Sequence, residues 1–374
     1  MRLWSLLAAG TIAAASAAGA VAVPPPVSAR AFVLLNPDSE EVLLDRAPDR
    51  RLPMASTTKI MTAIVTLERT RLTDTVVVPR AAVSAGGSTS GLVAGERLTV
   101  STLLTGLMIA SGNDASIALA THVGRGSEAR FVGYMNAEAK VMGLANTRFA
   151  NPHGLDQKGH YSTVHDLVSL GERGFQYPLL RQVVGRRVAT IPGPGGRGTR
   201  RLESENDLLA IDPEADGIKT GHTDGAGYAL VAHAKRRSNG VELYAALIGA
   251  SSRSRRARDA KRLFDWGFAQ YVRLEPLRAG QVVLRIPVRD RPGVTAAVTV
   301  DQPLSTTIRL GRKLRRTIVA PAEIVGPHAA GEIVGEVTIT EGSRVIGTRQ
   351  LVLAEPVDGP SITERIRSGI GRLL

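Results

Sequence analysis

Apolar positions recur with two different periods along the chain, and the period predicts where strands and helices lie. Strand-like alternation flanks a turn in two places, which predicts two β-hairpins: residues 31–35 with 42–45, and residues 227–232 with 241–249. Between the hairpins, residues 60–65 are an apolar run typical of a buried helix, and residues 103–110 are a second apolar run that ends before a turn. We therefore expect residues 30–272 to form an α/β domain in which a mostly antiparallel sheet packs against a helical lobe.

The pattern changes from about residue 275, where short alternating runs follow one another without helical segments. Four of these runs are predicted as strands: residues 281–288, 296–300, 333–340 and 350–353. Their spacing is typical of a sandwich, so residues 275–357 are predicted to form a small all-β, sandwich-like domain. No group of residues suited to catalysis is visible there.

The C-terminal segment, residues 360–374, follows Gly359 and has its own pattern. Isoleucine and leucine recur at helical spacing and arginines lie among them: Ile362, Ile366, Ile370, Leu373 and Leu374, with Arg365, Arg367 and Arg372. This pattern predicts a short amphipathic helix that lies on an anionic membrane surface. Docking of the helix on the β domain is the alternative.

At the N-terminus, Arg2 precedes an apolar, alanine-rich stretch that ends in small residues near Ala22. We interpret residues 1–22 as a signal peptide and residues 23–29, with their proline run, as a stiff leader. The alternative is an uncleaved anchor, although the apolar stretch is short for a membrane span. The chain has no cysteine, which excludes disulfides and a lipoprotein anchor. The protein is thus expected to be exported, to the periplasm or the outer face of the cytoplasmic membrane.

The formal net charge of +13 indicates that the protein binds a negatively charged partner. It fits attraction to anionic lipid or to an anionic wall polymer. Nucleic acid is the usual rival explanation, but an export signal and an aromatic content of only 4% argue against it. The sequence does not indicate an oligomeric state.

Candidate chemistry begins at Ser56-Thr57-Thr58-Lys59. If Ser56 opens a helix, Lys59 lies one turn further on the same face, where its amine reaches the serine hydroxyl. A lysine acts as a base only when its pKa is lowered by burial or by a second cation, and Lys219 would supply that cation. At a helix N-terminus, the backbone N–H of Ser56 would also stabilise an oxyanion.

Two further motifs follow in order, Ser111-Gly112-Asn113 and Lys219-Thr220-Gly221. Either S-x-x-K or S-x-N alone is expected about once by chance in a chain of this length, so the order of the three motifs carries the argument. Lys219 lies just before the first strand of the second predicted hairpin. We therefore expect it on a neighbouring strand at the edge of the sheet, where it borders a cleft. Together the motifs indicate an acyl-transferring enzyme with a serine nucleophile.

The three motifs resemble those of the peptidase S11 family, the low-molecular-mass penicillin-binding proteins that act as serine D-alanyl-D-alanine carboxypeptidases. The resemblance covers about residues 30–270 and includes further segments: residues 146–156, 159–163, 166–167, 206–209 and 266–268. One departure is Gly112, where the common form of the second motif has aspartate. The resemblance implies the fold of the serine β-lactamases and DD-peptidases, peptidoglycan stem peptides as substrates and β-lactams as covalent inhibitors.

The resemblance also implies a role for each matching residue. Ser56 would attack the carbonyl between two D-alanines, Lys59 would take its proton, and Ser111 with Lys219 would relay a proton to the leaving amine. Asn113 would bind the substrate amide. The remaining implied contacts are an oxyanion hole from the N–H groups of Ser56 and His222, and a site for the terminal carboxylate formed by the strand of Thr220, Gly221 and Thr223 with Arg256 or, as second choice, Arg253. Which lysine is the base stays open.

Three alternatives stand beside this interpretation. A β-lactamase or a D,D-endopeptidase would use the same chemistry, and a wall-binding scaffold would use none. The region between the second and third motifs offers no obvious glutamate for a deacylating water of the class A β-lactamase type. His153, His160 and His165 are expected to be structural, because no tight ligand cluster accompanies them. No metal or cofactor is expected.

Overall fold

The structure is a computed structural model that describes residues 10–12, 23–359 and 361–363. The chain divides into two compact units, Ala22–Ala269 and Gln270–Leu374 together with Met1–Val21. Except for residues 10–12 and 361–363, the predicted signal peptide (1–22) and C-terminal amphipathic helix (360–374) lie outside the described residues. Within the described ranges, no helix is both long enough and apolar enough to cross a membrane.

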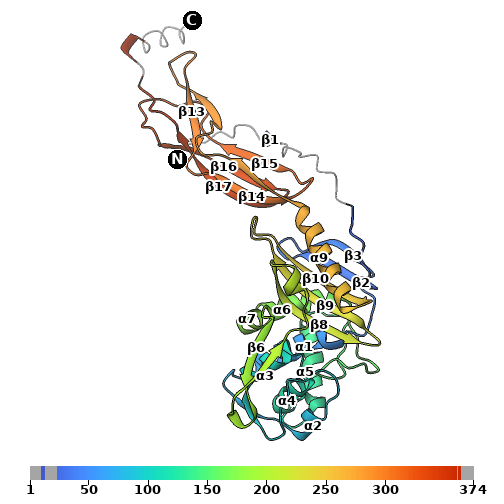
Figure 1. Ribbon diagram of the computed structural model, residues 1–374. Helices are drawn as coiled ribbons and strands as arrows, with labels where there is room; N and C mark the ends of the chain where they lie inside the picture. Colours follow the sequence, from blue (N-terminus) through green and yellow to red (C-terminus); the bar gives the residue numbers. More distant parts are fainter. Residues whose placement is uncertain (1–9, 13–22, 360, 364–374) are drawn as a thin grey trace. The chain divides into compact units, whose positions relative to one another are not determined.

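The first unit is built on a five-stranded sheet in the order β3-β2-β10-β9-β8, with every neighbouring pair antiparallel (Figure 1). The strands are β2 (Ala31–Asn36), β3 (Glu41–Arg46), β8 (Ala215–Thr223), β9 (Gly227–Lys235) and β10 (Glu242–Ala250). Both predicted hairpins are therefore confirmed. Strand β8, which carries Lys219, lies at the edge of the sheet as its sequence context predicted.

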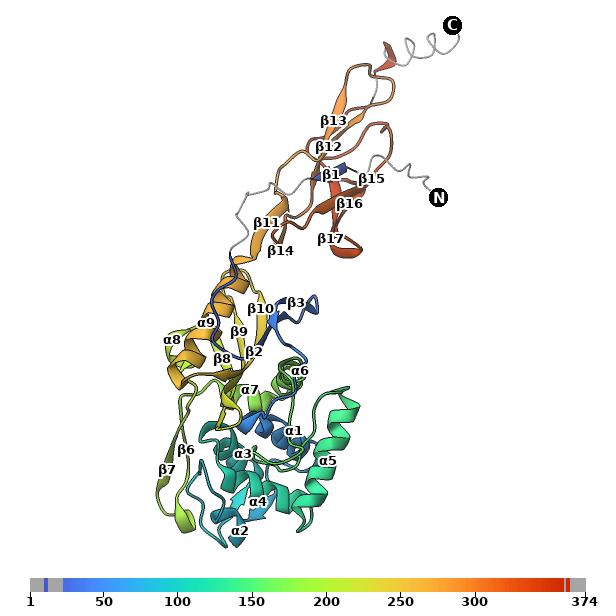
Figure 2. The same ribbon diagram turned by 90° about the vertical axis from the view of Figure 1, so that its right-hand side faces the viewer.

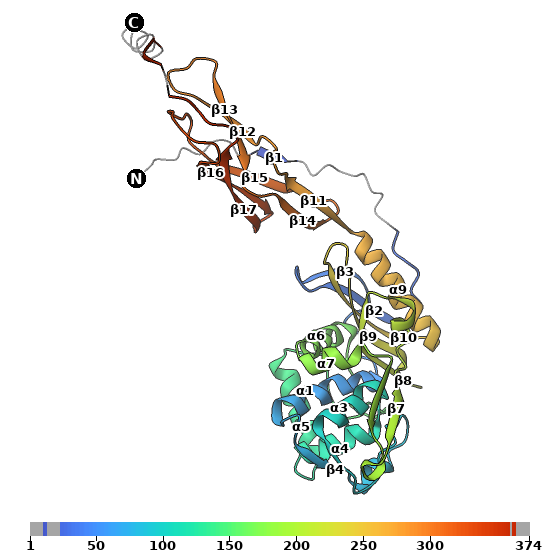
Figure 3. The ribbon, with the colours of Figure 1, turned by 60° about the vertical axis from the view of Figure 1, so that its left-hand side comes forward.

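Helices cover both faces of this sheet, because its strands place apolar side chains on both faces. Helix α9 (Arg253–Ala269) covers one face (Figure 3). On that face Gly267 packs against Leu34 and Leu243. Helix α6 (Val164–Phe175) covers the other, where Gly171 packs against Val231. The unit ends at Ala269 rather than at residue 272, because the next strand pairs within the second unit.

The helical lobe lies beyond α6 and contains the buried helix predicted at residues 60–65. Its helices are the 3₁₀ turn η1 (Ala55–Thr58), α1 (Lys59–Arg69), α2 (Arg80–Val83), α3 (Val100–Ile109), α4 (Asn113–Val123), α5 (Glu128–Val141) and α7 (Pro178–Val184). Threonine or serine caps α3, α5 and the neighbouring α6: Thr99, Ser127 and Thr163 each accept a hydrogen bond from the backbone N–H three residues on. The core is contiguous, with Ile60, Met61 and Ile64 fully buried.

Short elements complete the first unit. Strand β4 (Thr75–Val77) pairs with β5 (Arg97–Thr99), and β6 (Val188–Pro192) pairs with β7 (Thr199–Glu203). Figure 2 shows the β6–β7 hairpin running alongside the helical lobe. The turn of this hairpin contains η2 (Pro194–Gly196), and α8 (Leu208–Ile211) then leads into β8.

The second unit is all-β, as its alternating pattern predicted. Its strands are β1 (Gly10–Ile12), β11 (Tyr271–Leu277), β12 (Leu284–Pro287), β13 (Thr295–Val300), β14 (Leu304–Arg309), β15 (Leu314–Val319), β16 (Ile333–Glu341) and β17 (Arg344–Leu353). Six form a sheet in the order β1-β15-β16-β17-β13-β12, and β11 pairs with β14. The core between them includes Val298, Val337, Ile339 and Leu351.

Candidate active site

Ser56 lies in the 3₁₀ turn η1, immediately before α1, rather than in the first turn of α1 itself. The turn is held by its own side chains: the hydroxyls of Thr57 and Thr58 donate to the carbonyl oxygens of Met54 (2.6 Å) and Ala55 (2.8 Å). Ala55 adopts φ +49°, a left-handed conformation that is uncommon outside glycine. Ser56 is half-buried, and its N–H has no hydrogen-bond partner among the residues that the structure describes.

Lys59 is fully buried and its amine contacts three oxygens. Nζ lies 2.8 Å from Ser56 Oγ, 2.7 Å from Asn113 Oδ1 and 2.7 Å from the carbonyl oxygen of His153. The amide of Asn113 is fixed in this orientation because its Nδ2 donates to the carbonyl of Gly86 at 2.5 Å. Burial and the nearby Lys219 lower the pKa of Lys59 well below its usual value.

The geometry around Lys59 decides where the lone pair of its neutral form points. Two of the three neighbours, the Asn113 and His153 oxygens, can only accept hydrogen bonds. A neutral amine has two hydrogens, which those oxygens would take. The lone pair is then left facing the Ser56 hydroxyl, as a general base requires.

Ser111 occupies the tight turn between α3 and α4 and has φ +57°. Its side chain is 3% exposed, and the neighbouring Asn113 N–H donates to Ser88 O at 2.7 Å. The loop of Ser88 and Ser90 therefore packs directly on this turn. A Cβ at Gly112 would lie 2.1 Å from Ser90 Oγ and 2.4 Å from Asp114 Oδ1, so a larger residue at this position would require both side chains to turn.

Asp114 was not predicted as part of the site, yet it builds the neighbouring wall. Its buried carboxylate accepts hydrogen bonds from Thr89 Oγ1 (2.6 Å) and from the backbone N–H groups of Ser90 (2.9 Å) and Leu92 (3.0 Å). The loop that it holds borders a cavity of about 510 Å³ lined by Ser88, Thr89, Ala110, Arg201, Leu202, Glu203 and Glu205. The only sequence signal was an acidic residue in the first turn of α4, where aspartate commonly caps.

Strand β8 brings the third motif against the nucleophile. A Cβ on Gly221 would lie 2.8 Å from Ser56 N, so only glycine permits this approach of strand and turn. Lys219 is buried and donates to Thr220 O at 3.0 Å. Burial lowers the pKa of Lys219 to about 7, against the opposing effect of the Glu205 carboxylate. The His222 ring stacks on Tyr228, with ring centroids 4.1 Å apart.

Thr223 stands at the end of β8, where its hydroxyl already has partners. It donates to Asp156 Oδ1 at 2.8 Å and accepts from the Ala226 N–H at 3.1 Å. Because a hydroxyl has one hydrogen, Thr223 would have to leave Asp156 in order to donate to a substrate carboxylate. Its predicted role in substrate binding stays a prediction.

The two candidate arginines of α9 differ in their surroundings. Arg256 is 2% exposed; its guanidinium donates to Glu205 O at 2.7 Å and reaches Gly221 O at 3.5 Å, beside the third motif. Burial lowers the pKa of Arg256 to about 10, so it remains a cation at neutral pH. Arg253 forms a two-fold ion pair with the Asp207 carboxylate (2.6 and 2.8 Å). Because Arg253 is already paired and Arg256 lies beside the third motif, these surroundings favour Arg256 over Arg253 as the arginine that binds the terminal carboxylate.

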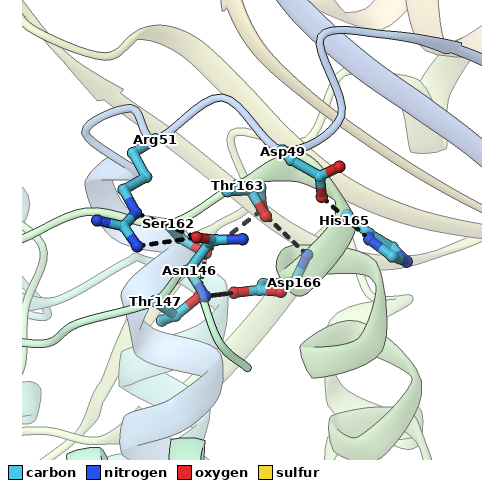
Figure 4. A network of polar contacts seen from close by, with 8 residues as sticks. All are labelled: Asp49, Arg51, Asn146, Thr147, Ser162, Thr163, His165 and Asp166. Atoms are coloured by element: carbon cyan, nitrogen blue, oxygen red, sulfur yellow. Dashed lines mark hydrogen bonds and ion pairs between the residues drawn. The ribbon is translucent and has the colours of Figure 1, made fainter. Parts of the chain in front are cut away.

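Residues 146–163 form a loop that supplies the third contact of Lys59. Figure 4 shows how both ends of this loop are anchored: Asp166 accepts from the N–H of Asn146 (2.9 Å) and from Thr147 Oγ1 (2.7 Å). Arg51 binds the Asn146 side chain, and Thr147 also contacts Ser162 at 2.7 Å. The loop anchored in this way carries the His153 carbonyl to Lys59. Burial and Lys59 lower the pKa of the His153 imidazole to about 4.

The structure thus brings Ser56, Lys59, Asn113 and Gly221 together, with Ser111 on the adjoining turn and Lys219 on the edge strand. A hydroxyl beside a buried amine, with a backbone N–H free to bind an oxyanion, is suited to acyl transfer through a covalent ester. His160, expected to be structural, contacts Thr58 of the nucleophile turn. His165 contacts Asp49 at 3.3 Å (Figure 4).

Comparison with known proteins agrees with this chemistry. The family model of the S11 peptidases, D-alanyl-D-alanine carboxypeptidase, matches residues 18–252. The chain is 31% identical to D-alanyl-D-alanine carboxypeptidase DacF of Bacillus subtilis, over 87% of this chain and 85% of that protein. It is 33% identical to DacC of Escherichia coli, over 89% and 85%.

Solved structures extend the likeness to both units. The Streptomyces K15 DD-transpeptidase is 33% identical and superposes with a TM-score of 0.63, over 66% of this chain and all (100%) of that one. Penicillin-binding protein 5 of Haemophilus influenzae is 27% identical with a TM-score of 0.63, over 90% of this chain and 99% of that one. With the catalytic geometry above, these matches establish that the chain belongs to the peptidase S11 family of serine D-alanyl-D-alanine carboxypeptidases.

Proposed function

We propose that this protein removes the terminal D-alanine from peptidoglycan stem pentapeptides through an acyl-enzyme on Ser56, and so takes part in peptidoglycan maturation and cell shape. The observation that carries the proposal is the placement of Lys59 Nζ, 2.8 Å from Ser56 Oγ with two obligate acceptors on its other sides. That arrangement activates a serine without a histidine or a metal ion.

In the first step Ser56 Oγ attacks the carbonyl carbon between the two D-alanines while Lys59 takes the hydroxyl proton. The oxyanion that forms is stabilised by the N–H groups of Ser56 and His222. The C–N bond then breaks, and the leaving amine takes the proton that Lys59 accepted from Ser56, relayed through Ser111 with the help of Lys219. D-Alanine departs, and water hydrolyses the ester to restore Ser56.

Substrate binding uses the groups around this centre. Asn113, whose Oδ1 lies 2.7 Å from Lys59 Nζ, would bind the substrate amide. Arg256, buried beside Gly221 and charged at neutral pH, would attract the terminal carboxylate toward the edge strand that carries Thr220 and Thr223. β-Lactams would acylate Ser56 by the same route.

The proposal is tested by exposing the full chain to a fluorescent penicillin and to diacetyl-L-Lys-D-Ala-D-Ala. The wild-type protein should be labelled and should release D-alanine, and Ser56→Ala should abolish both. Ser84→Ala, which changes an exposed serine in the same unit, is the matched control and should retain both. Labelling without release would favour an endopeptidase; absence of labelling would refute the acyl-enzyme.

For its location, we propose an exported protein held peripherally on the outer face of the cytoplasmic membrane by residues 360–374. The support is the sequence pattern of isoleucines and arginines in that segment and the charge of +13. Sedimentation with vesicles of phosphatidylglycerol and phosphatidylcholine tests this. The full chain should bind and a chain ending at Gly359 should not; equal binding of both would place the contact elsewhere.

A further inference from the structure

A directional chain of hydrogen bonds runs from the loop of residues 146–163 to the turn that carries Ser56. The Ala150 N–H donates to His160 Nδ1 at 3.0 Å, so Nδ1 is an acceptor. The ring hydrogen then lies on Nε2, which donates to Thr58 Oγ1 at 2.8 Å. Thr58 Oγ1 in turn donates to the carbonyl oxygen of Ala55 at 2.8 Å. Every direction is fixed, because an amide N–H only donates and a carbonyl only accepts.

The end of this chain bears directly on the reaction. The carbonyl of Ala55 and the N–H of Ser56 belong to one planar, trans peptide unit, in which they point in opposite directions. A hydroxyl that fixes the Ala55 oxygen therefore also fixes the direction of the Ser56 N–H. That N–H has no partner among the described residues and is the proposed oxyanion donor.

The histidine is itself held in place before substrate binds. Backbone bridges join Arg148 to Tyr161 and Leu52 to Ser162, on the residues that follow His160. The ring is 4% exposed and stands edge-on to Phe149, with centroids 6.1 Å apart. Burial, with a contribution from His153, lowers the pKa of His160 to about 4, so the ring is neutral at pH 7 as the hydrogen bonds require.

We propose that His160, acting through Thr58, is a positioning residue that aims the Ser56 N–H into the oxyanion hole. The inference rests on the proposed function, because it assigns a task in acylation of Ser56. It predicts that losing the hydrogen-bond chain slows the chemical step while substrate binding and folding persist.

The first test replaces the hydroxyl of Thr58 in full-length protein. Thr58→Val keeps the shape and removes the hydroxyl, and Thr58→Ser keeps the hydroxyl. Thr66→Val is the matched control: Thr66 is equally buried, and its hydroxyl donates to Thr62 O at 2.7 Å in the same helix, away from Ser56. The acylation rate constant with fluorescent penicillin, kcat and KM for the tripeptide, and Tm are measured for each.

We expect Thr58→Val to lower the acylation rate and kcat by about 10- to 100-fold, less than outright loss of an oxyanion donor, with KM changed less than about threefold. Thr58→Ser should stay within about threefold of wild type, and Thr66→Val should acylate normally. Equal acylation by Thr58→Val and Thr66→Val would overturn the proposal.

The second test addresses His160 itself. His160→Phe should reproduce the acylation defect of Thr58→Val, and the double variant should show little further loss because both changes break one chain. Normal acylation by His160→Phe, or additive losses in the double variant, would show that the histidine does not act through Thr58.

The third test does not depend on activity, so it separates this inference from the proposed function. Long-range ¹⁵N–¹H correlation on histidine-labelled protein at pH 7 should show His160 as the single Nε2–H tautomer, with a slowly exchanging proton that becomes fast-exchanging in Thr58→Val. A ring protonated on Nδ1, or an average of both tautomers, would refute the geometry. If wild-type protein is not labelled by penicillin, the proposed function fails whatever this spectrum shows.

Discussion

Substitution of Gly154 by alanine should displace the nucleophile although the residue carries no side chain. Gly154 has φ +97°, and a Cβ built on it would lie 2.1 Å from the carbonyl oxygen of Ala55 and 2.9 Å from Ser56 N. Both neighbours are backbone atoms, so no side-chain rotation can relieve the contact. Gly154→Ala must therefore move either the loop or the turn that carries Ser56.

The size of the effect follows from these distances. Real Cβ contacts essentially never fall below 3.0 Å, so the separation from the Ala55 oxygen must open by 3.0 − 2.1, or about 0.9 Å. Misplacing catalytic groups by about 1 Å costs roughly 100-fold in rate, equivalent to about 2.7 kcal/mol in the barrier. The left-handed conformation adds about 1–2 kcal/mol of destabilisation.

Gly159→Ala is a matched control from the same loop. Gly159 also has a positive φ, +83°, but its nearest neighbours are side-chain atoms of Arg148 at 3.8 Å. It should lose about 1–2 kcal/mol of stability through conformation alone and acylate at the wild-type rate. Penicillin acylation rates and urea unfolding are compared for both variants. If Gly154→Ala acylates within about twofold of Gly159→Ala, backbone contact does not set the position of Ser56.

Three further outcomes are expected. Because burial lowers the pKa of Lys219, the unfolded chain binds more protons than the folded chain between about pH 7 and pH 10.5, and the free energy of unfolding rises with pH in that window. Urea unfolding at pH 7 and pH 9.5 should show that this rise is about 2–3 kcal/mol smaller in Lys219→Met than in the wild type. An equal rise in both proteins would contradict the lowered pKa. Arg256→Gln should reduce kcat/KM for a tripeptide with a free carboxylate about 100-fold, whereas Arg253→Ala should change it less than about twofold; the reverse order would exchange their roles. Gly112→Asp, which restores the commoner motif, should destabilise the protein by about 1–3 kcal/mol, because the Ser90 hydroxyl and the Asp114 carboxylate must both turn away from the new side chain; urea unfolding without loss of stability would show that these side chains adjust freely.

The residues that we propose to be catalytic could be selected from the sequence because the proposed chemistry requires fixed spacings. Ser56 and Lys59 are one helical turn apart, and alternation around Lys219 placed it on an edge strand, which β8 is. The residues that contact them in the folded chain show no comparable spacing in the sequence. Asp114 and His153 act through contacts between segments far apart in sequence, and the useful atom of His153 is its backbone oxygen, which any residue could supply.

Strands of the second unit were missed for a different physical reason. In β14 the buried apolar residues are Leu304 and Ile308, and in β15 they are Leu314 and Ile318, each pair four residues apart. The position between them on the same face is a half-buried threonine or arginine, so the alternation needed to recognise a strand is broken. A spacing of four residues fits a helix equally well. The two segments are strands because β14 pairs with β11 and β15 pairs with β16.

The position of the nucleophile is set by backbone approaches more than by functional side chains. Gly221 brings β8 against Ser56 N, and Gly154 brings the loop of residues 146–163 against the Ala55 oxygen. At both points a Cβ would lie closer than 3.0 Å to a backbone atom of the turn that carries Ser56. The third residue of the K-T-G motif is therefore required sterically, whereas the role proposed for its lysine is chemical. A chain that kept every polar group of this site but carried alanine at these glycines would hold those groups at the wrong distances from one another. The acylation rate would then fall, while substrate binding would not change.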